Sequence, residues 1–318
     1  MEFIIETSNL TKKYGELTAV DNLSIQVKEG EIFGLLGPNG AGKTTIISML
    51  STMLKPTAGT ATVNSYDILK ESAEVRKSIG IVFQECVLDE RLTGRENLEI
   101  HARFYKLSKG IRNVRIDEVL ELVEMKDRAN DFVKIYSGGM KRRLEIARGL
   151  VHYPKVLFLD EPTLGLDPQT REHVWTYIRQ LAQKEKMTVI LTTHYMEEAD
   201  SLCNRIAIID YGKIIALDTP ENLKNTLGGS SIILQVFDIE KAKMLFPYAR
   251  ISRDKIILPV KRIETDIGRI FRTAIKNQLQ IYETRIHTPS LNDVFIFLTG
   301  REIREEKPEN NIKKVHGG

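Results

Sequence analysis

Residues 37–44 constrain this chain more than any other segment, because they fit the pattern G-x-x-x-x-G-K-[ST] without exception. A short apolar run at residues 31–36 precedes them, and residues 44–54 follow with apolar side chains at helical spacing. In a strand–loop–helix unit of this kind, glycines let backbone N–H groups approach phosphate oxygens, and the helix adds the positive end of its dipole. The sequence therefore predicts a phosphate cradle rather than a glycine-rich turn with an exposed lysine. In this cradle, Lys43 reaches the β- and γ-phosphates of a nucleotide and Thr44 holds Mg²⁺.

The rest of the first 227 residues is typical of an α/β domain. Short β-branched or leucine-rich runs at residues 156–160, 187–194 and 205–210 are expected to be strands buried on both faces. Helical segments separate them, which indicates a mostly parallel sheet. A charged, largely helical stretch at about residues 85–152 is interpreted as a helical subdomain inserted between two core strands. We therefore expect one domain over residues 1–227.

The pattern changes at Gly228 and Gly229, after which strand-like and helix-like segments alternate to residue 300. This predicts a small α+β domain at 228–300, closed by a helix in LNDVFIFLTG. A ligand-binding regulatory module is one interpretation of it, and a dimer-stabilising appendage is the favoured one because no polar constellation stands out there. Residues 301–318 form a polar tail that is expected to be disordered.

Composition limits the possible functions. The net charge of +3 is too small to indicate a nucleic-acid partner. No stretch approaches the roughly 18 uninterrupted apolar residues of a membrane-spanning helix, and the N-terminus does not resemble a signal peptide. Cys86 and Cys203 are far apart and are expected to be reduced thiols. If this protein takes part in transport, the channel is expected on another chain.

Two more segments carry residues suited to nucleotide chemistry. Asp160 and Glu161 follow an apolar strand, where open α/β sheets bind their ligands. Asp160 can serve Mg²⁺, and Glu161 can reach an attacking water. His194 ends the next predicted strand and could hold that water in line, although a histidine at such a place is commonly a plain loop residue.

Ser137 precedes a helical pattern and is suited to be its N-cap. Gly138 and Gly139 would weaken that helix by about 1 kcal/mol each relative to alanine. The cations at 141–143 crowd the positive end of the helix dipole. An anion docked at Ser137-Gly138-Gly139 would offset both costs, and so would neighbouring carboxylates.

In this order and spacing, the motifs resemble the nucleotide-binding domains of ABC transporters over about residues 3–225. The family has a P-loop, a glutamine (Gln84), an SGG motif, a strand ending Asp-Glu, a Leu-Asp loop (Asp167) and a switch histidine, all present here. The resemblance implies an ABC-type P-loop ATPase fold, with ATP and Mg²⁺ as cofactors. Tyr136 stands where many members have leucine.

The resemblance also implies roles for individual residues. Tyr14 stacks on adenine, Gln84 senses Mg²⁺ and the membrane subunit, and Ser137 and Gly139 bind ATP held by the other protomer of a homodimer. The implied catalytic residues are Lys43, Gln84, Glu161 and His194. The implied Mg²⁺ ligands are Thr44, Gln84 and Asp160. The implied nucleotide-binding residues are Tyr14, Gly37, Pro38, Asn39, Gly40, Ala41, Gly42, Lys43, Thr44, Thr45, Ser137, Gly138, Gly139 and Asp167.

Residues 288–302 narrow the match, because they resemble the C-terminal end of the daunorubicin-resistance type of drug-export ATPase. This implies a homodimeric ATPase on the cytoplasmic face of the membrane, working with a separate integral-membrane permease. The expected cargo is a drug, antibiotic, lipid or similar hydrophobic compound. A soluble ABC ATPase not coupled to transport is the alternative. A signalling GTPase is disfavoured, because the chain has no Asn-Lys-x-Asp motif.

Overall fold

The computed structural model describes residues 3–252, 255–260 and 262–301. Its central sheet has six strands in the order β11-β10-β4-β9-β8-β7, and all neighbours are parallel except β11, which runs antiparallel to β10. Every residue of β4, β8 and β9 is buried, as expected for strands covered on both faces. The strands are β4 (Ile32–Leu36), β7 (Ile79–Val82), β8 (Val156–Asp160), β9 (Thr188–Thr193), β10 (Arg205–Asp210) and β11 (Lys213–Asp218).

A second, antiparallel sheet was not predicted. It has the order β2-β1-β5-β6, with β3 also paired to β1. Helix α1 (Lys43–Leu50) contacts β2 and β5 of this sheet and β8 of the central sheet. Its apolar side chains are buried between the two sheets, which fixes where the helix begins. The strands are β1 (Phe3–Tyr14), β2 (Leu17–Leu23), β3 (Gln26–Lys28), β5 (Ala58–Val63) and β6 (Tyr66–Asp67).

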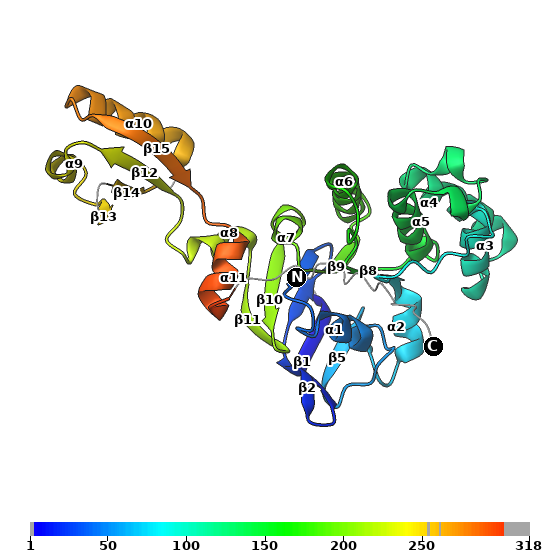
Figure 1. The fold of residues 1–318 in the computed structure, drawn as a ribbon. Coiled ribbons are helices and arrows are strands. Elements are labelled where there is room, and N and C mark those ends of the chain that lie inside the picture. Colours follow the sequence, from blue (N-terminus) through cyan, green and yellow to red (C-terminus); the bar gives the residue numbers. More distant parts are fainter. Residues whose placement is uncertain (1–2, 253–254, 261, 302–318) are drawn as a thin grey trace, which may run out of the picture.

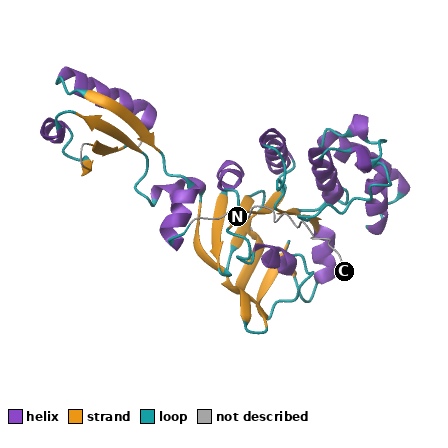
Figure 2. Cartoon of the chain, viewed as in Figure 1, coloured by secondary structure: helices purple, strands orange, loops and turns teal. Residues whose placement is uncertain are grey.

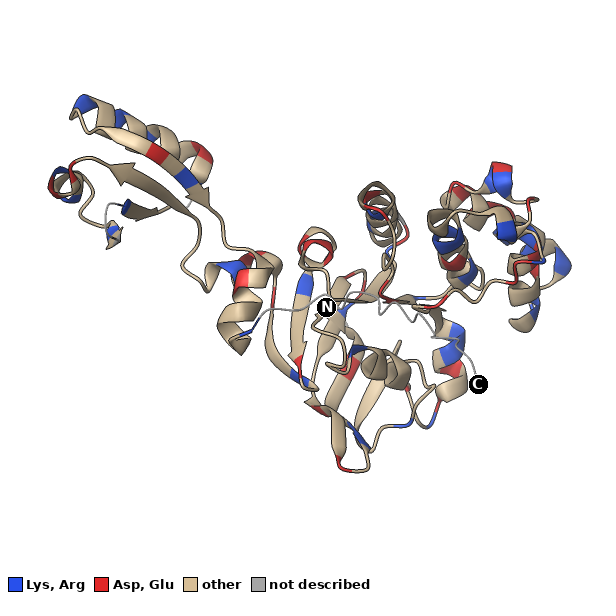
Figure 3. Ribbon diagram, viewed as in Figure 1, with Lys and Arg blue, Asp and Glu red and all other residues tan. Residues whose placement is uncertain are grey.

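The segment between β7 and β8 forms a helical subdomain, seen as helices and loops beside the strand-rich core (Figure 2). Thr93 and Glu96 make a capping box at the start of its first helix, which fixes the helix boundary. Figure 3 shows acidic and basic residues interleaved along these helices. The elements are α3 (Gly94–Phe104), α4 (Lys109–Leu122), the short 3₁₀ turns η1 (Lys126–Arg128) and η2 (Val133–Ile135), and α5 (Gly138–Leu150).

The remaining helices of the core surround the central sheet. Pro168 and Pro220 occupy first-turn positions of α6 and α8, where a missing N–H costs nothing. The helices are α2 (Ser72–Ser78), α6 (Pro168–Lys184), α7 (Met196–Leu202) and α8 (Pro220–Asn225).

A small domain follows α8 and projects from the core (Figure 1). Its antiparallel sheet has the order β13-β14-β12-β15, and two helices pack against it around a separate apolar cluster that includes Leu234, Leu258 and Ile270. The elements are β12 (Ser231–Val236), α9 (Ile239–Leu245), β13 (Arg250–Ser252), β14 (Lys255–Pro259), α10 (Ile263–Lys276) and β15 (Ile281–His287).

The helix expected to close the small domain packs elsewhere. Helix α11 (Leu291–Thr299) lies against α7 and α8 of the core (Figure 1), and Leu291, Val294 and Phe295 are buried in the core's apolar cluster. None of its residues belongs to the small domain's cluster. The division expected at residue 228 therefore needs correction, because the chain leaves the core at α8 and returns to it at α11. In the sequence, α11 directly follows the small domain and has an apolar face, so the sequence alone assigns it to that domain.

The return is fixed by Arg301, two residues after the end of α11. Arg301 donates hydrogen bonds to Asp210 Oδ1 at 2.6 Å and to the Tyr211 hydroxyl at 2.9 Å, in the turn between β10 and β11. This residue was expected to begin the polar tail; the remaining residues, 302–318, lie outside the described part of the chain.

Among the described residues, no helix has the length and apolar character needed to span a membrane.

Candidate active site

The loop between β4 and α1 carries the predicted phosphate cradle. Gly40 and Gly42 have φ values of 77° and 101°, which favour glycine. A Cβ atom at Gly42 would lie 2.3 Å from the backbone oxygen of Ala19 in β2, so only glycine fits there. Gly37 and Ala41 are buried, whereas Asn39 and Gly40 are exposed at the tip. Thr44 and Thr45 follow in the first turn of α1, where free N–H groups face any bound anion.

Lys43 is the first residue of α1, and its side chain is buried. Its amine donates to the backbone oxygens of Gly37 at 2.7 Å and Pro38 at 3.1 Å. Burial lowers the pKa of this amine, and the charges of Glu161 and Asp160 act in the opposite direction. The lysine is therefore held inside its own loop, with its charge balanced by acids at the end of β8.

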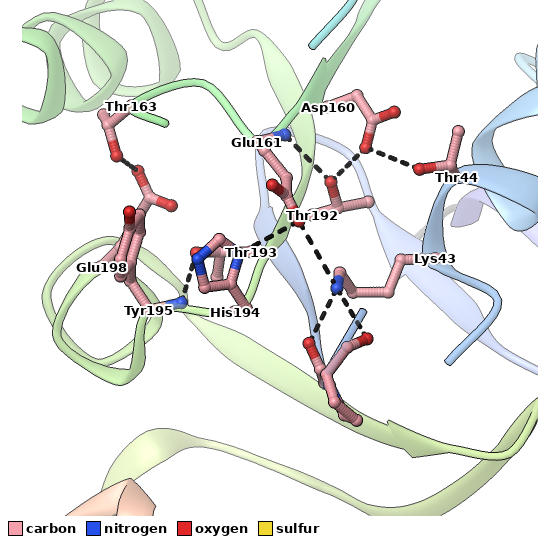
Figure 4. A network of polar contacts seen from close by, with 12 residues as sticks. Lys43, Thr44, Asp160, Glu161, Thr163, Thr192, Thr193, His194, Tyr195 and Glu198 are labelled. Carbon is pink, nitrogen blue, oxygen red and sulfur yellow. Dashed lines mark hydrogen bonds and ion pairs between the residues drawn. The ribbon is translucent and has the colours of Figure 1, made fainter. Parts of the chain in front are cut away.

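The acid pair meets α1 across the edge of the central sheet (Figure 4). Asp160 ends β8, and its Oδ1 accepts hydrogen bonds from the hydroxyl groups of Thr44, at 3.3 Å, and Thr192 on β9. Carboxylate and hydroxyl oxygens are ligands that Mg²⁺ prefers. Asp160 and Thr44 thus form a partial donor set of the predicted kind. Among the contacts of the described residues, none joins Gln84 to either of them; Gln84 follows β7 and is exposed.

Glu161 lies between two nitrogen-bearing side chains. Its Oε1 is 3.1 Å from His194 Nδ1 and 3.5 Å from Lys43 Nζ (Figure 4). Burial raises the pKa of this carboxyl, but the bonds and charges of His194 and Lys43 outweigh that effect and hold it below its ordinary value. Its backbone has φ of 48°, a region that costs energy for a side chain with a Cβ and that is common at functional sites.

The SGG segment and Asp167 lie together, in a different place. Ser137 caps α5 by accepting from Met140 N–H, and Asp167 caps α6 by accepting from Thr170 N–H. A Cβ on Gly139 would lie 2.4 Å from the Thr170 side chain, so this glycine allows α5 to approach α6. Ser137, Gly138 and Asp167 are exposed. Figure 1 places α5 in the helical subdomain, away from α1.

Each cation at the start of α5 has a carboxylate partner. Lys141 pairs with Glu90, Arg142 with Glu145 and Arg143 with Glu124. Neighbouring carboxylates were one of the two explanations that the sequence left open for this basic cluster. The three ion pairs agree with that explanation and require no anion at the SGG segment.

Tyr14 ends β1 and is exposed, in the hairpin that carries Ala19 and so borders the phosphate loop. Nothing in the described contacts holds its ring in one position except Lys12, whose amine lies 5.2 Å from the ring centroid.

Arg142 and Glu145 are site residues that sequence reasoning missed. The buried guanidinium of Arg142 donates to the backbone oxygens of Pro162 at 2.7 Å, Asp160 at 3.0 Å and Glu161 at 3.1 Å, and also to that of Phe83. Glu145 bonds Arg142 through one oxygen and the N–H of Val87 through the other. This pair fixes the backbone of the acid pair and of the segment around Gln84.

No signal in the sequence identified Arg142, because a charged residue on a helix is ordinarily exposed to solvent. Its partners are backbone oxygens from distant segments, which no sequence pattern reveals.

The site's residues are suited to bind a polyphosphate with its cation. A loop of N–H donors, a buried lysine, a hydroxyl–carboxylate pair and a hydrogen-bonded Glu–His pair meet at the end of one sheet. Glycine at position 42 allows the loop backbone to pack closely against that of Ala19. The residues fit ATP and Mg²⁺ as the groups to be held there.

Comparison with known proteins agrees with this chemistry. Residues 20–164 match the family model described as ABC transporter. The linearmycin resistance ATP-binding protein LnrL of Bacillus subtilis is 40% identical, over 95% of this chain and 100% of its own length. The daunorubicin resistance ATP-binding protein DrrA2 of Streptomyces coeruleorubidus is 40% identical, over 94% of this chain and 95% of its own.

Among solved structures, the dimeric, post-hydrolysis ATP-binding cassette MJ0796 bound to ADP and Pi is similar with a TM-score of 0.61 and 30% identity. The match covers 68% of this chain and 98% of that one, so this chain has a region beyond the cassette fold. The 40% identity to two resistance ATPases, over nearly the full length of each, shows the family. The chain is an ABC-type ATPase and belongs to the ATP-binding proteins of ABC transporters, related to those of drug- and antibiotic-resistance exporters.

Proposed function

We propose that this protein powers export of a drug, antibiotic, lipid or similar hydrophobic compound, as a homodimer bound to a separate integral-membrane permease. The observation that carries the proposal is the Lys43–Glu161–His194 cluster beside the Thr44–Asp160 pair. Two relatives are named for resistance to linearmycin and to daunorubicin, which supports the cargo class. The permease would place this chain on the cytoplasmic face of the membrane.

In this proposal, the phosphate loop and Lys43 hold the phosphates of ATP, and Thr44, Asp160 and Gln84 hold Mg²⁺. When bound, ATP would supply the phosphoryl group and Mg²⁺ would neutralise the charge that develops on it. Glu161 accepts the proton of a water molecule, and its lowered pKa keeps it ionised for that role. His194 Nδ1 holds the Glu161 carboxylate, and Tyr14 offers an exposed ring for the base.

The homodimer follows from the separation between the two predicted halves of the site. Ser137 and Gly138 are exposed at the start of α5, which lies in the helical subdomain away from α1 of the same chain, and Asp167 is exposed at the start of α6. A second copy related by a two-fold axis would bring its SGG segment over this chain's phosphate loop and produce two equivalent sites. The cassette MJ0796 is dimeric in its ADP- and Pi-bound structure, which supports this arrangement by similarity.

The permease contact is proposed on the helical subdomain. A cavity of about 250 Å³ opens between the segment after Gln84 and α3, lined by Val87, Ile100, His101, Phe104 and Arg148 among others. The Phe104 side chain is 78% exposed, and with the exposed Val87 and Ile100 it forms an apolar surface at this cavity. An apolar cytoplasmic helix of the permease would cover it.

Two experiments test the proposal. Glu161→Gln should keep ATP binding, lose about 10²–10⁴-fold in turnover and accumulate an ATP-bound dimer seen as a doubled mass by light scattering. The same variant with Lys43→Ala added should stay monomeric. A Glu161→Gln protein that remains monomeric at saturating ATP and Mg²⁺, even beside its membrane partner, would contradict the dimer model.

The second experiment concerns coupling to transport. Affinity purification of the full chain from its native membranes should recover a polytopic membrane protein, and Phe104→Ser should lose it while ATP binding is kept. Recovery of only soluble partners would favour the alternative, a soluble ABC ATPase not coupled to transport. A matched control is Phe132→Ser, because Phe132 is also exposed in the helical subdomain but does not line the cavity.

A further inference from the structure

One buried carboxyl group near the site has no role in the scheme above. Glu198 lies on α7, four residues after His194, and its side chain is 0% exposed. A carboxyl group without solvent needs hydrogen-bond partners, because burying it unpaired is costly. The groups that donate hydrogen bonds to Glu198 therefore indicate which parts of the fold it connects.

Glu198 joins three separate elements through one oxygen atom. Its Oε1 accepts a hydrogen bond from the Thr163 hydroxyl at 2.7 Å and another from the Trp175 indole N–H at 3.0 Å. Thr163 lies two residues after Glu161 and is itself completely buried. Trp175 lies on α6, the helix that Asp167 caps.

The three elements carry residues of the candidate site. The loop after β8 carries Glu161 and the segment before α7 carries His194 (Figure 4). The start of α6 carries its N-cap, Asp167. On the opposite side, Glu161 Oε1 contacts His194 Nδ1 directly. The Glu198 hydrogen bonds and the Glu161–His194 contact therefore link the same segments at two points. As a result, neither Glu161 nor His194 can shift alone without breaking a hydrogen bond.

Burial also affects the pKa of the Glu198 carboxyl. It raises the pKa of this group above its ordinary value, against the effect of the hydroxyl and indole donors. An amide has the same shape as this carboxyl and keeps an oxygen that can accept the hydrogen bonds from Thr163 and Trp175. Glutamine should therefore reproduce it, and alanine should not.

We propose that Glu198 is a positioning residue for ATP hydrolysis, which holds the Glu161 loop, α6 and the His194 segment as one body. This rests on the proposed role of Glu161. A buried glutamate that merely stabilises the fold would give a different result in the experiment below, because it would leave turnover per folded molecule unchanged.

The chain carries its own reporter for this contact. Trp175 is the single tryptophan of the sequence, so its emission reports directly on the environment of its indole N–H. The full chain is measured with and without ATP and Mg²⁺, as wild type, Glu198→Ala and Glu198→Gln. Glu197→Ala is the matched control, because Glu197 is the preceding residue of α7 and is exposed.

We expect Glu198→Ala to shift the Trp175 emission and to lower kcat about tenfold or more, with KM for ATP changed less than about threefold. Glu198→Gln should restore the emission and bring kcat back to within about threefold of wild type. Glu197→Ala should resemble wild type in both measurements.

The proposal is overturned if folded Glu198→Ala keeps kcat within about twofold of wild type, or if Glu198→Gln is as impaired as alanine. If Glu198→Ala does not fold by circular dichroism, Thr163→Val decides. It removes one donor at nearly constant volume and should lower kcat at constant KM; unchanged kcat would reject the proposal. If the wild-type protein itself does not hydrolyse ATP, the proposed function fails instead. The Trp175 emission can be measured without hydrolysis, so this failure is distinguishable from failure of the Glu198 proposal.

Discussion

Lys43 and Glu161 form an ion pair inside the phosphate site, with Nζ and Oε1 3.5 Å apart and both side chains buried. The lysine that we propose to bind phosphate is therefore already paired with the carboxylate that we propose as the base. A bound γ-phosphate would compete with Glu161 for this amine, since both are anions. Binding of nucleotide is thus expected to release Glu161 as it engages Lys43, with His194 as the remaining hydrogen-bond partner of the carboxylate.

Replacing Lys43 by alanine removes this cation. A charge-assisted hydrogen bond contributes about 1.5–3 kcal/mol, so ATP affinity or turnover should fall at least about tenfold while the fold is kept. Nucleotide binding by titration calorimetry and phosphate release are the measurements. Lys77→Ala, an exposed lysine paired with Glu74, is the control. Unchanged hydrolysis by folded Lys43→Ala protein would reject the assignment of the phosphate site.

Replacing Arg142 by lysine keeps the charge and loses the planar fork. Lysine cannot reach the backbone oxygens of Asp160, Glu161 and Pro162 together, so the acid pair should lose its fixed backbone. We expect kcat to fall about tenfold or more with little change in KM, measured by steady-state hydrolysis. Arg143→Lys is the control and should have little effect, because Arg143 pairs with the exposed Glu124. Equal kcat in the two variants would show that the fork does not matter.

The fold's acid sensitivity should come from the helical subdomain. Burial lowers the pKa of both His101 and His152 to about 4, from an ordinary 6.5, with positive charges of Arg148 and Arg115 nearby and, at His152, the Ile79 oxygen opposing the shift. Because the folded state disfavours the charged form, the stability tied to neutral histidine is fully present above pH 6.5 and falls as the pH drops toward about 4.

Thermal unfolding at about pH 7.5 and about pH 5 measures this loss, and His152→Gln should reduce it. The matched control is His173→Gln, since His173 is exposed on α6. A pH dependence identical in His152→Gln and wild type would contradict the prediction.

Two shortened chains should behave differently. A chain ending at Leu227 lacks α11 and uncovers the core surface that Leu291, Val294 and Phe295 bury, at about 1.5–3 kcal/mol for each side chain. A chain in which a short glycine–serine linker replaces residues 230–288 keeps α11. The second chain should bind ATP with wild-type affinity and unfold at a higher temperature than the first.

Pull-down of the membrane partner by the linker chain then tests the small domain itself. Lost pull-down or a shorter dimer lifetime, with intact ATP binding, would support an accessory role in assembly. Equal melting temperatures of the two shortened chains would contradict the packing of α11.

The sequence predicted the parts of the fold whose cause is local. Short apolar, β-branched or leucine-rich runs at β4, β8 and β9 signalled strands buried on both faces, and the glycines of residues 37–42 signalled the loop. The antiparallel sheet of β1, β2 and β5 escaped prediction because its strands carry mixed polar and apolar residues without a clean alternation.

The site was predicted where motif order identifies the residue, as for Lys43, Asp160 and Glu161, which the fold brings together at the end of one sheet. The roles of Tyr14, Gln84, Ser137 and Asp167 remain predictions, since they depend on nucleotide or on a second copy. Arg142 and Glu198 could not be found, because their partners are backbone oxygens or side chains from distant segments.

The position of α11 has a consequence for synthesis. A ribosome makes the residues of the core up to α8, then the whole small domain, and only afterwards the helix that covers α7 and α8. Domains generally fold as they emerge, yet this core has an uncovered apolar surface until α11 has been translated. An interrupted product would therefore carry the complete phosphate loop on a core whose apolar surface at α7 and α8 is still exposed.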